Sequence, residues 1–129
     1  MPTIDAAEGL SGLLQWSEPL IFDRLFDGYR AIVGDLVLAR SLARQHGRVW
    51  RALIRGDLIE FEVQRGVLTA SLDHCGVHLD RLADVDADIM SELLEVVMTR
   101  YQHSRRMAKV YHLALIELAG RLAPTRAAA

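Results

Sequence analysis

Two histidines four residues apart are the side chains of this chain best suited to chemistry. His74 opens the segment His74-Cys75-Gly76-Val77-His78, inside a stretch whose apolar residues recur at helical spacing. Residues at positions i and i+4 share one face of a helix, so both imidazoles can point the same way. An imidazole on an apolar helix is a common ligand of a metal ion or a haem iron. The pair therefore marks the candidate site.

The composition indicates one globular domain and argues against a nucleic-acid binder. The chain has 129 residues, of which 51% are hydrophobic, and 15 basic against 17 acidic side chains give a formal net charge of −2. A nucleic-acid binder would normally carry a basic surplus on one face. The arginines between Arg40 and Arg55 alternate with Leu, Val and Trp. We interpret them as a solvated helix face rather than a phosphate-binding patch.

The location predicted for the chain is the cytoplasm. Its one cysteine, Cys75, excludes an intramolecular disulfide and suits a reducing compartment. The first ten residues have no cationic stretch before an apolar one, so they do not have the pattern of a signal peptide. The apolar runs fall well short of the ~20 residues that cross a bilayer. We expect no membrane partner.

Helical periodicity extends almost from end to end and predicts an all-α domain of six to seven helices. Ser17 and Asp57 have the character of N-caps, and Gly56 that of a C-terminal stop. Residues 84–86 have the composition of a turn followed by a cap. The predicted helices cover residues 3–16, 18–34, 36–55, 58–82, 87–101 and 104–118. Gly47 is a candidate break in the third of these, and Gly66 and Gly76 are candidate interruptions of the fourth, since glycine costs a helix interior about 1 kcal/mol relative to alanine. Residues 1–129 thus form one domain, with 1–16 as an N-terminal extension helix and 124–129 as a frayed tail.

The order of these segments resembles a sensor globin, the haem-binding domain of globin-coupled sensors, and the haem-free globin-like domains of stress-signalling regulators. The segment Arg24–Asp27 is similar to the family's second-helix element. Trp50–Gly56 resembles its Trp-x-x-Leu-x-x-Gly element, and His74 follows that Gly at about the distance of the family's proximal His. Residues 89–101 and 104–118 are similar to the last two helices of the globin core. The resemblance spans about Ser17 to Ala119.

The resemblance implies a globin-like fold that holds haem b non-covalently, with His74 as the proximal ligand of the iron and His78 as its substitute. Phe26 stands where the family has a distal Tyr, and it offers no hydrogen bond to a bound gas; Tyr29 and Trp50 are the donors near it. A histidine, His78, stands where the family has Gly. The residues expected to line the haem are His74, Phe26, Tyr29, Val49, Trp50, Leu53, Val67, Ala70, Val77 and His78.

The function implied is sensing of a diatomic gas or of redox state, passed on through a homodimer of the last two helices or through a separate signalling partner. Two alternatives stay open. One is the same fold without haem, acting as a regulatory interaction module. The other is a diiron or other metal-binding helical bundle, with His74 and His78 joined by His112 and Glu117. We expect no enzyme, because the chain lacks a phosphate-binding glycine loop and a nucleophile elbow. His46 and His103 have charged neighbours and are predicted to lie on the surface.

An absorption spectrum separates the haem prediction from both alternatives. The purified protein, with and without added haem, is expected to show a Soret band that His74→Ala abolishes. A colourless protein after reconstitution supports the haem-free module. If the Soret band is lost in His78→Ala but kept in His74→Ala, the iron ligand is His78, one helical turn further along. Two irons without porphyrin indicate the diiron bundle.

Overall fold

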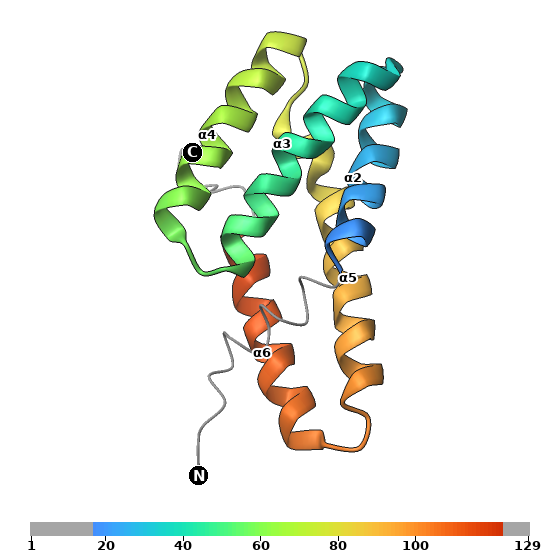
Figure 1. Cartoon of the computed structure of the whole chain (residues 1–129), viewed down its shortest axis with the longest axis vertical. Coiled ribbons are helices and arrows are strands. Elements are labelled where there is room, and N and C mark those ends of the chain that lie inside the picture. Colours follow the sequence, from blue (N-terminus) through green and yellow to red (C-terminus); the bar gives the residue numbers. More distant parts are fainter. Residues whose placement is uncertain (1–16, 123–129) are drawn as a thin grey trace.

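Five α-helices and one short 3-10 helix follow one another in residues 17–122, the part of the chain that the computed structural model describes (Figure 1). The all-α prediction is confirmed there. The predicted extension helix 1–16 and tail 124–129 lie outside the described residues, so the count of six to seven helices stays a prediction. None of the described helices is long and apolar enough to cross a membrane. The elements are α2 (Glu18–Val33), α3 (Leu36–Ile54), α4 (Leu58–Cys75), η1 (Leu79–Leu82), α5 (Ala83–Arg100) and α6 (Arg105–Leu122).

Aspartate caps and left-handed glycines set the helix boundaries. The side chain of Asp35 accepts hydrogen bonds from the first backbone N–H groups of α3, and Asp57 accepts one from Glu60 at the start of α4. Such caps satisfy donors that the first helical turn leaves unpaired. Gly34 ends α2 at φ 73°, a backbone conformation that favours glycine. The predicted start of α4 and end of α2 are thereby confirmed.

Two boundaries in the second half of the chain differ from the full-length prediction. The helix expected over residues 58–82 ends at Cys75, at the candidate interruption Gly76, because Gly76 takes the left-handed conformation and its N–H bonds back to the last turn. His78 then precedes the short η1. Residues 84–86, expected as a turn and cap, lie in the first turns of α5. Acidic side chains are also favoured there, since they face the positive end of the helix dipole.

The helix α3 is the centre of the packing. It packs against α2 on one side and α4 on the other, and the three lie side by side in the upper part of Figure 1. The helix α5 packs against α2 and pairs with α6 in a hairpin, whose turn lies at the lower end of the view, away from α3 and α4. The largest fully buried side chains come from all five helices and η1: Leu25, Tyr29, Leu42, Trp50, Leu53, Leu68, Leu72, Leu82, Ile89, Leu93 and Tyr111.

The side chain of Val85 on α5 packs directly against the α2 backbone at Gly28. A Cβ atom added to Gly28 would lie 2.6 Å from Val85 Cγ2 and 3.2 Å from its Cγ1. Further along the same pair of helices, Arg24 Nε donates to Glu92 Oε1 at 2.6 Å. Glycine at position 28 thus lets α5 come near enough for the residue after Val85 to reach into the core.

Gly28→Ala is expected to lower the free energy of unfolding, although alanine is the better helix former. Relief of the helical glycine is worth about 0.5–1 kcal/mol, whereas overpacking against a stiff valine costs about 1–3 kcal/mol. We expect a net loss of roughly 1–2 kcal/mol in urea denaturation. Gly66→Ala is the matched control, because nothing lies within 4 Å of its added Cβ. It should be stabilising, and equal effects of the two substitutions would contradict the close approach.

Candidate functional site

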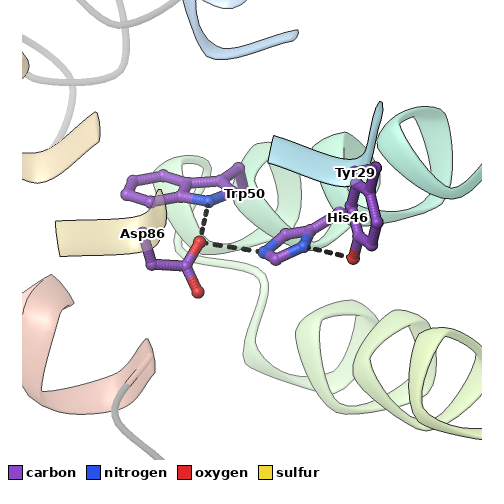
Figure 2. A network of polar contacts seen from close by, with 4 residues as sticks. All are labelled: Tyr29, His46, Trp50 and Asp86. Atoms are coloured by element: carbon purple, nitrogen blue, oxygen red, sulfur yellow. Dashed lines mark hydrogen bonds and ion pairs between the residues drawn. The ribbon is translucent and has the colours of Figure 1, made fainter. Parts of the chain in front are cut away.

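A network of four polar side chains lies inside the protein, between α2, α3 and α5 (Figure 2). The Tyr29 hydroxyl from α2 lies 2.8 Å from His46 Nδ1 on α3. His46 Nε2 lies 2.9 Å from Asp86 Oδ1 on α5. The Trp50 indole Nε1, also on α3, donates to the same carboxylate oxygen at 2.9 Å. Three helices are joined through one chain of hydrogen bonds.

The spacing of His46 and Trp50 lets α3 present two donors at one point. They are four residues apart, so they lie on one face of the helix, and both reach Asp86. The carboxylate reaches the core because residues 84–86 are helical, which turns Asp84 and Asp88 to solvent and Asp86 inward. The network therefore depends on the early start of α5.

Every donor in the network has an acceptor when the Tyr29 hydroxyl donates its hydrogen bond to His46. An indole N–H only donates, so Asp86 Oδ1 is the acceptor for Trp50, and it accepts from His46 Nε2 as well. His46 Nδ1 is then free to accept from the Tyr29 hydroxyl. Burial, and next to it the negative charge of Asp86, hold the pKa of Tyr29 well above its ordinary value. The phenol therefore stays protonated, and its O–H can donate the hydrogen bond to His46 Nδ1.

The order Tyr29, His46 and Asp86 resembles an acid-base relay, but the burial of these side chains indicates a structural role. Tyr29 is 0% exposed and His46 1% exposed, which leaves no approach for a substrate to the phenol or the imidazole. Asp86 is the most accessible member, and both donors occupy the same one of its oxygens. The network holds α5 against α2 and α3, and we assign it that role.

The prediction that His46 lies on the surface is wrong. Its neighbours Arg44 and Arg48 are exposed, but His46 lies about half a turn away from them on α3 and faces the core. A signal was present in the sequence, because Leu42, His46, Val49 and Leu53 follow the spacing of a buried helix face. The charged neighbours outweighed that spacing in the prediction.

Four of the residues expected to line a haem lie on the surface of the protein. His74, His78, Val67 and Ala70 are all exposed. The helix α4 carries apolar residues on two faces, and it turns Phe61, Leu68 and Leu72 to the core instead. Apolar spacing alone does not say which of two apolar faces packs inward.

The other residues expected around a haem are mostly buried. Tyr29, Val49, Trp50, Leu53 and Val77 lie in the core. The remaining one, Phe26, is half-buried and stacks on Phe22 with ring centroids 6.2 Å apart.

The predicted haem residues therefore fall into two groups that do not face a common space. The expected distal donors, Tyr29 and Trp50, are engaged with His46 and Asp86, while the expected ligand His74 points to solvent. As these side chains lie, they do not fit a porphyrin. Haem binding stays a prediction from the sequence.

The residues proposed for a diiron site are likewise dispersed over the fold. His112 is half-buried on α6, and Glu117 is exposed and bonds to Arg121 within the same helix. Among residues 17–122, no group of three or more His, Cys, Asp or Glu side chains is placed to hold a metal ion. His103 is exposed, as predicted.

Removal of the Asp86 carboxylate should destabilise the fold strongly. Asp86→Ala leaves the His46 and Trp50 N–H groups without an acceptor, and each unsatisfied buried donor costs about 1–3 kcal/mol. We expect a loss of roughly 2–5 kcal/mol in urea denaturation. Asp86→Asn keeps an acceptor oxygen and should lose less. Asp88→Ala, on the exposed side of the same helix, should stay within about 0.5 kcal/mol; an equal loss there would contradict the role of the network.

Comparisons with protein-family models, with characterised proteins and with solved structures found no match to this chain. The likeness to sensor globins therefore stays a prediction that depends on the order and spacing of its residues.

Proposed function

We propose that this protein is a helical regulatory module that works as a homodimer through α6 and needs no haem. The observation that carries the proposal is the outward face of α6, where Leu113 is 58% and Ile116 54% exposed. A water-exposed pair of large aliphatic side chains on one helix face is the kind of surface that a protein partner covers. The partner we assign is the α6 helix of a second copy.

The charges beside Leu113 favour self-pairing. Lys109 and Glu117 lie four residues before and four residues after it, and both are exposed. In an antiparallel pair of α6 helices centred on Leu113, Lys109 of each copy meets Glu117 of the other, a carboxylate that also bonds to Arg121 of its own helix. One turn further out the same register sets Arg105 against Arg121, so the favourable charge contact is the one directly beside Leu113. Such a two-fold contact is isologous, the commonest arrangement in soluble homodimers.

The polar network supports a module of this kind rather than a ligand-binding pocket. Tyr29, His46 and Trp50 fill the space between α2, α3 and α5 with their own hydrogen bonds. The hairpin of α5 and α6 is thus held in a fixed place on the other helices, with Leu113 turned outward. A haem-bound gas or redox sensor remains the prediction of the sequence resemblance, and no contact among the described residues favours it.

Leu113→Glu should convert the protein from dimer to monomer. A charged side chain at the centre of the interface would be buried against its own copy, which is costly without a partner. Light scattering after size exclusion should give twice the 14.4 kDa chain mass for the wild type and the single mass for the variant. Lys109→Glu and Glu117→Lys should each weaken the dimer, and the two together should restore it.

Ile59→Glu is the matched control, because Ile59 is 82% exposed and lies on α4 rather than on α6. It should leave the dimer intact. A wild-type monomer, or a dimer that dissociates in Ile59→Glu but not in Leu113→Glu, would overturn the assignment of α6.

A further inference from the structure

Two surface stripes of opposite charge lie on the outward faces of α3 and α5. We call Arg40, Arg44 and Arg48 the arginine stripe of α3; they are exposed and follow one another every four residues. The sequence of α3 contains no Asp or Glu. We call Asp84, Asp88 and Glu95 the acidic stripe of α5; they are exposed on one face of that helix. Each stripe is a row of like charges about one or two helical turns apart.

The buried network fixes the two stripes on opposite sides of the molecule. His46 and Trp50 point from α3 toward Asp86, and the arginines two positions away from them point the other way. In the same manner Asp86 points from α5 toward α3, and Asp84 and Asp88 point outward. One copy therefore presents positive charge on one side and negative charge on the other.

Several of these charges have no partner within the described part of the chain. No ion pair there involves Arg44, Arg48, Asp88 or Glu95. Arg40 lies over the ring of Phe26, with its guanidinium carbon 5.8 Å from the centroid. A hollow of about 450 Å³ follows the arginine stripe and is bordered at its end by the apolar Leu36 and Val37.

We propose that the arginine stripe of α3 binds the acidic stripe of α5 of a second copy, with the two helices antiparallel. In this register Arg40 faces Glu95 and Arg48 faces Asp88. The same register brings Val37, which is 80% exposed, against Met98, which is 49% exposed. A parallel register with Arg40 facing Asp88 would set Val37 against Val85, which is half-buried and packed against the core. Only the antiparallel register brings Val37 against an exposed apolar side chain.

The receiving side of the contact is hollowed as well. A hollow of about 670 Å³ between α2 and α5 is lined by Glu92 and Glu95, by the two arginines Arg24 and Arg100, and by Leu20, Val96 and Thr99. Arg24 is bonded to Glu92, which leaves Glu95 as the carboxylate offered to the arginine stripe. The carboxylates of Glu18, Asp57 and Glu60 border the hollows on either side of α3. Such a mixed border disfavours a polyphosphate chain along the arginine stripe and is compatible with a protein surface.

Because the two stripes face opposite ways, the contact is head-to-tail. One copy binds a second, and the second still presents a free stripe to a third, so association continues as concentration rises. Single exposed ion pairs are weak and are screened by salt. The assembly should accordingly form at low ionic strength and high protein concentration, and it should dissociate when salt is added. The α6 dimer, which apolar side chains hold together, should stay associated when salt is added.

Sedimentation velocity over a concentration series, in the Leu113→Glu background, tests the proposal apart from the α6 dimer. The weight-average sedimentation coefficient should rise with concentration at low salt and stay constant at high salt. Arg40→Glu with Arg48→Glu should remove the rise, and so should Asp88→Arg with Glu95→Arg. All four substitutions in one chain reverse the two facing charges of each stripe, leave the sum of charges unchanged, and should restore the rise.

Glu62→Arg with Asp73→Arg on α4 is the control for net charge, since both residues are exposed and lie outside the stripes. This variant should still associate. Circular dichroism melts check that every variant is folded. A constant sedimentation coefficient of the parent protein at low salt would overturn the proposal, as would a four-fold variant that fails to associate. The result for the α6 dimer is read separately, from the protein without Leu113→Glu at high salt.

Discussion

The carboxylate of Asp86 is the constraint on which the rest of the arrangement depends. A carboxylate drawn into a protein interior needs donors in place of water, and without them its transfer is very unfavourable. Two donors come from α3, spaced by one helical turn, and a third helix joins through Tyr29. Glycine at position 28 lets α5 lie close enough for this to happen. Charge, spacing and the close packing of Val85 on Gly28 therefore act together at one junction.

The same junction determines what the outer surface presents. A residue two positions from a buried one lies roughly on the opposite side of a helix, so the inward aim of His46, Trp50 and Asp86 fixes the outward aim of the arginines and aspartates beside them. Burial of the network and segregation of surface charge are two results of a single orientation. A rotation of α5 that exposed Asp86 would turn the acidic stripe toward the core.

Local capping interactions made several helix boundaries predictable. Which face of each helix packs against the core depends on tertiary contacts, and these were not predictable in the same way. The cap at Asp57 and the stop at Gly34 act within one or two turns, and short-range patterns report them well. The face of α4 was not predictable in this way, because Val67 and Ala70 form an apolar row as regular as that of Phe61 and Leu68. Nor was the burial of the α5 carboxylate, whose partners stand 36 and 40 positions earlier in the chain.

The protonation of the His46 ring tests the central claim most directly. A nitrogen-15 correlation spectrum of the imidazole at neutral pH reports which ring nitrogen carries hydrogen. We expect a proton on Nε2, bonded to Asp86, a bare Nδ1, and a slowly exchanging Tyr29 hydroxyl proton that couples to it. A ring protonated at Nδ1 alone, or one that exchanges freely with water, would contradict the network and with it the placement of α5.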